Sequence, residues 1–204
     1  MPSPFQIRQA ASAIRNQGVI CYPTESVFGL GCDPLCYTAV DRILQLKQRP
    51  IHKGLILIAS RIEQLAPYIQ LSNAQQTQLL EQTSATTWLV NKSADTPPWI
   101  SGCHSKVAIR LSRHPLVQVL CDQLGSAIVS TSANPSTQAA AKTLLRVKQY
   151  FPDQLDYYLN GELGNVGNAT PIIDMQSGNI IRESSFTSSV TQPTQDNNTN
   201  PLNH

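Results

Sequence analysis

The sequence predicts an α/β protein, and two observations lead to this prediction. Short apolar runs rich in valine and isoleucine, bounded by glycine or proline, are typical of buried strands. They alternate with longer stretches in which apolar residues recur at helical spacing. Helices interspersed with strands along the chain favour a three-layer domain in which a sheet lies between helices.

The first half of the chain alternates between these two patterns. A helix is predicted over residues 4–17, where apolar residues share one face, and a buried strand over residues 19–22, which Pro23 closes. After a glycine-rich loop, a second helix is predicted to begin near Thr38 and to end at Pro50. The further elements of this half are a strand at 55–59 and helices at 61–69 and 72–82.

The second half is richer in strands. A strand is predicted over residues 107–111, and its alternation places Arg110 on the face opposite its apolar residues. Pro115 suits the first position of a helix that Gly125 ends. The remaining elements are a strand at 127–129, a Ser-Thr-Ser-Ala-Asn turn at 130–134, a helix near 139–151 and short strands around 156–159, 171–175 and 179–182.

Length and composition fit one folded domain followed by a tail. A chain of 204 residues suits a single domain of about 180 residues. Residues 184–204 contain mainly serine, threonine, asparagine and glutamine, and have too little to bury to offset their ordering entropy. We therefore predict a folded domain over residues 1–183 and a disordered tail over 184–204.

The composition argues against secreted and membrane proteins. The N-terminal helix lacks the apolar core of a signal peptide, and no segment reaches the roughly 18 uninterrupted apolar residues of a membrane helix. The five cysteines have neither a CxxC pair nor zinc-binding spacing. We predict a cytoplasmic protein with reduced, mostly buried thiols, no membrane contact and no metal held by its own side chains.

A basic segment, Arg42–Lys53, is the most informative local feature. It carries four full positive charges and a histidine without an acidic residue, although the net charge of the chain is only +2. Arginine can hold anionic oxygens through two parallel hydrogen bonds, so one interpretation is a phosphate site. The other is a solvated helix end, because basic side chains favour the negative pole of the helix dipole. The segment by itself leaves both interpretations open.

Hydrogen-bond donors and cations gather at predicted loop positions. This set contains Thr24, Ser26, Lys47, Arg49, Lys53, Arg110, Ser130, Ser132, Asn134 and Arg182. The phosphate-binding motif GxxxxGK[ST] and the nucleophile motif GxSxG are both absent, and the four histidines offer no compelling base. Such a set suits phosphoryl or nucleotidyl transfer, in which catalysis is mainly positioning and charge neutralisation. Each member also has an ordinary explanation as a cap, a turn or a solvent-facing residue.

Three sequence blocks occur together and in a fixed order. They are PTESVFGLGCD at 23–33, LKQRP at 46–50 with KGL at 53–55, and STSAN at 130–134. Jointly they resemble the YrdC family, and most of all its short, single-domain form, over residues 5–183. The resemblance implies an α/β fold in which helices flank a twisted, mixed β-sheet around an open, positively charged cavity.

The resemblance also implies an activity, that of an L-threonylcarbamoyladenylate synthase. Such a nucleotidyltransferase joins L-threonine, bicarbonate and ATP, with Mg²⁺ as the expected metal ion, to threonylcarbamoyl-AMP and pyrophosphate. The threonylcarbamoyl group then passes to adenosine 37 of tRNA, in bacteria through TsaD acting with TsaB and TsaE. The implied partners are these substrates, the transfer complex and tRNA.

The resemblance implies roles for ten residues, which divide between two substrates. Lys47 and Arg49 match a catalytic K-x-R pair at the phosphates of ATP, whereas Arg42 matches no role and is interpreted as solvated. The set implied for ATP is Lys47, Arg49, Lys53, Ser132, Asn134, Thr170 and Arg182. The set implied for L-threonine is Thr24, Arg110 and Ser130. A carbamate formed on threonine is itself the nucleophile, so no protein nucleophile is needed.

One stretch departs from the family pattern. Family members usually carry a Trp-Pro-Gly-Pro-like turn before a threonine-containing strand, but residues 82–89 read QTSATTWL. We expect Thr87 to occupy the position of the strand threonine and the turn to be built differently. Because of this departure, a third possibility stays open: a degenerate paralogue that binds nucleotide without turnover.

A function of a different class also remains open. Arg42, Lys47, Arg49 and Lys53 would contact RNA phosphates in a non-catalytic RNA-binding module, whose binding would weaken steeply as salt rises. No aromatic residues are interleaved with these basic ones and the net charge is near zero, which argues against this alternative.

Overall fold

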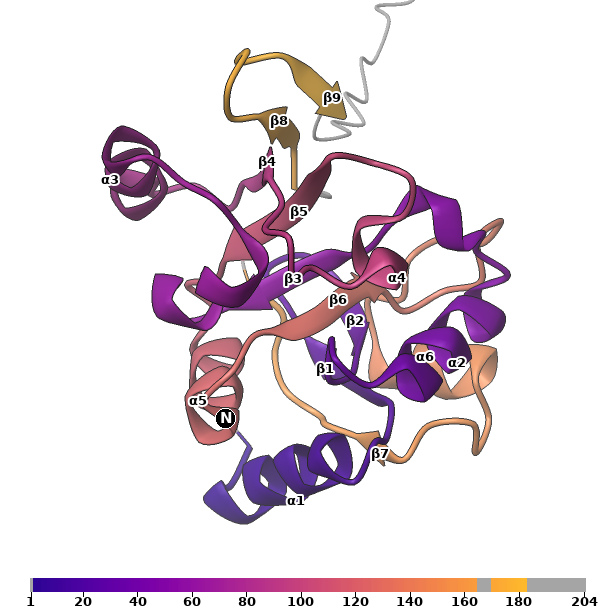
Figure 1. The fold of residues 1–204 in the computed structure, drawn as a ribbon. Coiled ribbons are helices and arrows are strands. Elements are labelled where there is room, and N and C mark those ends of the chain that lie inside the picture. Colours follow the sequence, from indigo (N-terminus) through magenta and orange to yellow (C-terminus); the bar gives the residue numbers. More distant parts are fainter. Residues whose placement is uncertain (1, 165–169, 183–204) are drawn as a thin grey trace, which may run out of the picture.

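The structure, a computed structural model, describes residues 2–164 and 170–182 (Figure 1). Its helices are α1 (Pro4–Arg15), α2 (Tyr37–Lys47), α3 (Asn73–Glu81), α4 (Pro98–Ser101), α5 (Pro115–Leu124) and α6 (Leu144–Tyr150), with 3-10 turns η1 (Ile51–Lys53), η2 (Ile62–Gln64) and η3 (Ala66–Tyr68). Its strands are β1 (Ile20–Pro23), β2 (Phe28–Gly31), β3 (Ile56–Ala59), β4 (Thr87–Asn91), β5 (Lys106–Leu111), β6 (Ile128–Ser132), β7 (Tyr157–Tyr158), β8 (Ile172–Asp174) and β9 (Ile180–Arg182). The tail predicted at 184–204 lies outside the described residues.

The strands form one mixed sheet, which confirms the predicted α/β class. Their order is β7-β1-β2-β6-β3-β5-β4-β8-β9. The pairs β1–β7, β3–β5 and β4–β8 are parallel, and the other neighbours are antiparallel. Helices lie on both sides of the sheet, so the domain has three layers (Figure 1).

The first face of the sheet is covered by α1 and α5, which pack against each other (Figure 1). A capping box starts α1, because the Ser3 side chain accepts from the Gln6 N–H and the Gln6 side chain accepts from the Ser3 N–H. The buried cluster on this face consists of Ile7, Ala10, Ala11, Ile14, Ile20, Tyr22, Ile58, Leu116, Val117, Leu120, Cys121, Ile128 and Leu159.

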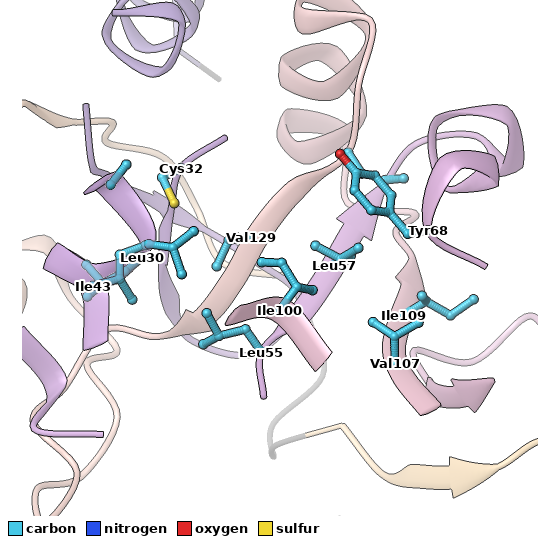
Figure 2. Packing of buried hydrophobic residues seen from close by; sticks show 14 of the residues in the cluster. Leu30, Cys32, Ile43, Leu55, Leu57, Tyr68, Ile100, Val107, Ile109 and Val129 are labelled. Carbon is cyan, nitrogen blue, oxygen red and sulfur yellow. The ribbon is translucent and has the colours of Figure 1, made fainter. Parts of the chain in front are cut away.

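The second face carries the larger core, beneath α2, α4 and α6. Figure 2 shows part of it, in which strand residues meet Ile43 of α2 and Ile100 of α4. The strand residues drawn there include Leu30, Leu57, Val107, Ile109 and Val129. Because side chains alternate along a strand, the neighbours of these residues in sequence face α1 and α5 or the space beside them.

The glycine-rich loop predicted after Pro23 is partly wrong, because residues 28–31 form β2 between β1 and β6. A Cβ on Gly31 would lie 2.7 Å from Cε1 of Tyr22 and 2.8 Å from the carbonyl oxygen of Val129. Glycine in this strand therefore marks a close approach of neighbouring chains, not a loop.

Three further boundaries differ from the prediction. Residues 61–69 form the 3-10 turns η2 and η3 instead of an α-helix, because Pro67 lacks an N–H and its ring would clash with the preceding helical turn. Strand β6 continues through Ser132, so only the end of the 130–134 segment is a turn. Helix α6 begins only after its N-cap, Thr143. The short α4 was not predicted, and a strand at β4 was expected only from the resemblance, through Thr87.

Most of the cysteines are buried, as expected. Cys21, Cys32 and Cys121 are buried free thiols, Cys36 is partly buried and Cys103 is exposed. Burial raises the pKa of Cys21 and of Cys121 to about 12. In the described part of the chain, no helix is long and apolar enough to cross a membrane.

Candidate active site

A cavity opens on the first face of the sheet, beside the cluster that α1 and α5 cover. Along β3, Ile58 belongs to that cluster, whereas Ile56 on the same side of the strand lines the cavity. Along β6, Ile128 is covered, whereas Ser130 and Ser132 line the cavity. Its volume of about 840 Å³ is within the range of small-molecule sites.

All ten residues to which the sequence analysis assigned a substrate line this one cavity. They are Thr24, Lys47, Arg49, Lys53, Arg110, Ser130, Ser132, Asn134, Thr170 and Arg182. They come from segments far apart in the sequence, which the sheet brings together. No aspartate or glutamate is among the lining residues that the structure describes. The cavity therefore presents cations and hydrogen-bond donors.

Lys47, at the end of α2, is buried, and its Nζ contacts the segment that follows β6. Nζ donates to the carbonyl oxygens of Ser132, at 2.5 Å, and of Asn134, at 2.8 Å. Burial, and to a lesser extent the charge of Arg49, lowers the pKa of Lys47 from 10.5 to about 8. A bound anion would offset both effects, so this ammonium group is suited to hold negative charge.

The end of α2 and the segment after β6 are also joined through the backbone. The carbonyl oxygen of Lys47 accepts from the N–H and the Oγ of Ser136, at 2.9 and 2.6 Å. Gln48 caps α2 in the left-handed region, with φ of 50°, and the next N–H, of Arg49, donates to the carbonyl of Leu44 at 2.9 Å. This turn directs both Lys47 and Arg49 into the cavity.

Arg49 and Arg182 bring two more positive charges to the cavity. Nη2 of Arg49 donates to the carbonyl of Gly54, and Nη2 of Arg182 to the carbonyl of Thr170, both at 2.9 Å. Burial lowers the pKa of each, and the charges of Arg110 and Arg49 lower that of Arg182 further. No carboxylate of the described residues forms an ion pair with either guanidinium. Such a cluster of cations favours an anionic ligand.

Arg110, on β5, is buried and is held by side chains from three other segments. Nε and Nη2 donate to Oγ1 of Thr87, at 3.1 and 2.8 Å, and Nη2 also donates to Oγ1 of Thr170. Nη1 lies 3.4 Å from Oε2 of Glu25. Thr87 therefore stands beside Arg110 even though residues 82–89 lack the usual turn.

Thr24 and Ser130 contribute hydroxyl groups to the same cavity. Oγ1 of Thr24 donates to the carbonyl of Val27 at 2.7 Å, which fixes the loop between β1 and β2. Ser130 pairs with Ile56 in the antiparallel register of β6 and β3, so the sheet itself positions its side chain.

One wall of the cavity, the segment after α4, was not predicted from the sequence. The lining residues of this segment are Ser101, Cys103, His104, Ser105 and Lys106. Gly102 turns the chain there with φ of 62°, and a Cβ on it would lie 2.3 Å from the carbonyl oxygen of His52. Nζ of Lys106 pairs with Asp174, which joins β5 to β8 and lowers the pKa of that carboxyl. No motif marks this segment, and only its packing places it at the site.

Arg42 lies outside the cavity, as the sequence analysis expected. Its Nη1 pairs with Oδ2 of Asp156 at 2.7 Å, and both side chains are 40% exposed. Asp156 also accepts the N–H of Val19 at 2.7 Å. The basic segment therefore divides into a surface ion pair and three residues at the cavity.

Sequence comparisons connect the chain to a known family. A family model for Sua5, YciO and YrdC proteins, described as telomere recombination, matches residues 12–184. A protein of Stutzerimonas stutzeri named threonylcarbamoyl-AMP synthase is 46% identical over 187 residues, which cover 89% of this chain and 99% of that protein. A protein of the same name from Pseudomonas aeruginosa is 46% identical over 188 residues, with the same coverage.

Solved structures share the fold. Sua5 of P. abyssi complexed with L-threonine matches with a TM-score of 0.79 and 28% identity, over 85% of this chain and 52% of that one. YciO of E. coli matches with a TM-score of 0.78 and 25% identity, over 90% of this chain and 91% of that one. Both have the mixed sheet flanked by helices that is described above.

Proposed function

The chain belongs to the Sua5/YciO/YrdC family, and from this premise we propose that it is an L-threonylcarbamoyladenylate synthase, a nucleotidyltransferase. It joins L-threonine, bicarbonate and ATP to threonylcarbamoyl-AMP and pyrophosphate. One observation carries the proposal: ten residues with expected substrate roles line a single cavity, and no described carboxylate lines it with them. The shared name of the relatives supports it, as does the threonine complex of Sua5.

We assign the cations at one part of the cavity to the triphosphate of ATP. Lys47 and Arg49 stabilise the charge that develops on the leaving pyrophosphate, with Lys53 and Arg182 as further donors. Ser132, Asn134 and Thr170 are assigned to the rest of the nucleotide. Because these groups are held in place before the ligand arrives, little reorganisation accompanies the reaction.

We assign L-threonine to the part of the cavity at Arg110. The guanidinium pairs with the substrate carboxylate, and Thr24 and Ser130 hold the same amino acid. The amine of threonine attacks bicarbonate and forms a carbamate with loss of water. A carbamate oxygen then attacks the α-phosphorus of ATP while pyrophosphate leaves. The protein supplies orientation and positive charge, and the substrate supplies the nucleophile.

Mg²⁺ enters this scheme with ATP. No group of three or more histidine, cysteine, aspartate or glutamate residues in the described ranges is placed to hold a metal ion. The polar residues that line the cavity include cations and hydroxyls, but no described carboxylate is among them. Mg²⁺ prefers oxygen ligands and commonly binds through substrate phosphates. The ion is therefore part of the substrate complex.

The product has a proposed destination. Threonylcarbamoyl-AMP passes to the TsaD complex, with TsaB and TsaE if the source is bacterial, for transfer to position 37 of tRNA in the cytoplasm. We place the catalytic domain within residues 1–183. A separate RNA-binding role receives less support, because Arg42 is engaged with Asp156 on the surface and does not extend the basic cavity.

The test is a reconstituted reaction. Purified protein with ATP, Mg²⁺, bicarbonate and labelled L-threonine should release pyrophosphate and form the labelled adenylate. Omission of threonine should abolish both products, and serine in its place serves as a matched substrate control. Pyrophosphate release that does not depend on threonine would reject the proposal, and RNA binding without turnover would favour the alternative.

ATP affinity should fall as the pH rises through the pKa of Lys47. That pKa is about 8 in the free protein, so Lys47 loses its proton above this value and can no longer pair with phosphate. Below it the affinity should be level, and above it the affinity should fall by at most about tenfold per pH unit. Titration calorimetry across this range should also detect proton uptake on binding. Lys47→Arg, which stays charged, should remove the dependence, and a level profile for the unmodified protein would contradict the assignment.

A further inference from the structure

A buried polar pair, Glu25 and Ser112, lies behind Arg110 and has no role in the reaction described above. Glu25 is 6% exposed and Ser112 is 1% exposed. Neither is among the described residues that line the cavity, although Arg110 is. The carboxylate is therefore out of reach of a ligand in the cavity and touches the guanidinium from the protein side.

The pair is part of a continuous chain of hydrogen bonds. Oγ of Ser112 accepts the N–H of His114 at 3.2 Å and donates to Oε1 of Glu25 at 2.5 Å. The other oxygen, Oε2, faces Nη1 of Arg110 at 3.4 Å. The start of α5 thus fixes Ser112, Ser112 fixes the carboxylate, and the carboxylate fixes one side of the guanidinium.

The donors of Arg110 are nearly all used within the protein. A guanidinium carries five N–H groups. Nε and Nη2 direct three of them to Thr87 and Thr170, and Nη1 directs one to Glu25. Among the described contacts, one N–H of Nη1 remains. A ligand carboxylate must therefore meet Arg110 through Nη1, the nitrogen that Glu25 orients.

We propose that Glu25, held by Ser112, is a positioning residue that orients Nη1 of Arg110 toward the carboxylate of the amino-acid substrate. This inference rests on the proposed function, because it takes Arg110 as the carboxylate ligand. Thr87 and Thr170 hold Nη2, on the opposite side of the guanidinium. Without Glu25, Nη1, the nitrogen that is left to bind the ligand, loses the contact that orients it. The affinity for threonine depends on that anchor, whereas the affinity for ATP does not.

The test is direct binding of L-threonine and, separately, of ATP to the full chain, measured by calorimetry. Glu25→Ala should weaken threonine binding about tenfold, as loss of a hydrogen bond to a charged group does, with ATP binding unchanged. Glu25→Gln keeps an acceptor oxygen and should recover part of the loss. Ser112→Ala should produce a smaller loss. Asp174→Asn is the matched control. The carboxylate of Asp174 is buried, pairs with Lys106 and makes no contact with Arg110, so this variant should leave threonine affinity unchanged.

The outcomes separate this inference from the function on which it rests. An unmodified protein that does not bind threonine would reject the proposed function, and this inference with it. Threonine binding by the unmodified protein and equally by Glu25→Ala would overturn the inference alone. Equal losses for threonine and ATP, without recovery in Glu25→Gln, would show a structural role and would also overturn it. If Glu25→Ala does not fold, Glu25→Gln and Ser112→Ala decide by the same comparison.

Discussion

Replacement of Lys47 by alanine should lower threonine-dependent pyrophosphate release by about two orders of magnitude or more, as loss of a transition-state charge contact commonly does. The expected effect has two sources. The ammonium group is assigned to the leaving pyrophosphate, and it also bonds the carbonyl oxygens of Ser132 and Asn134. Its removal therefore takes away a charge and loosens the segment assigned to the nucleotide.

Two variants test whether the effect comes from the charge of Lys47. One controls for the packing of its side chain, and the other for the loss of any basic residue from α2. Lys47→Met keeps most of the buried stem but removes the charge and both bonds of Nζ. It should therefore lose less stability than the alanine variant and remain as inactive. Arg42→Ala removes a basic residue of the same helix that lies outside the cavity, and should keep full activity with a small loss of stability. Release rates for Lys47→Met within about tenfold of the unmodified protein would mean that the phosphate site lies elsewhere.

The sequence predicts the fold where local patterns decide it. Helices α1 and α5 follow from apolar spacing, with Pro115 and Gly125 at the ends of α5, and β5 follows from its alternation. Strand β2 was missed because its glycines indicate a loop in isolation. Their real cause is contact with Tyr22 and Val129, which belong to the neighbouring strands. Such a cause becomes visible only when the sheet is assembled.

In the candidate site too, some features follow from local sequence patterns and others only from the assembled fold. Ten of its lining residues could be predicted, because most of them fall in motifs whose order along the chain resembles a family. Their supports could not. Lys47 and Ser132 are 85 residues apart, as are Glu25 and Arg110, and no local pattern connects either pair. Thr87 reaches Arg110 through the pairing of β4 with its neighbouring strands. The segment after α4 reaches the cavity through one glycine turn.

Replacement of Arg110 by methionine should abolish threonine binding and should also destabilise the fold. Arg110 is the only cation that forms an ion pair with Glu25 among the described residues. Without it, a buried carboxylate keeps its bond from Ser112 but loses its counterion. Removal of one partner of a buried ion pair typically lowers the free energy of unfolding by about 3–5 kcal/mol. Urea denaturation measures this loss, and calorimetry measures threonine binding.

A second change should restore stability without restoring function. In Arg110→Met with Glu25→Gln, no buried charge remains unpaired, so most of the lost unfolding free energy should return. Threonine binding should stay absent, because the carboxylate ligand is still missing. Stability and binding are thereby assigned to different atoms of one network: the counterion effect to Glu25, and substrate recognition to Nη1 of Arg110. Recovery of threonine binding in the double variant would show that Arg110 is not part of the substrate site. An Arg110→Met protein as stable as the unmodified one would show that the buried pair contributes nothing to stability.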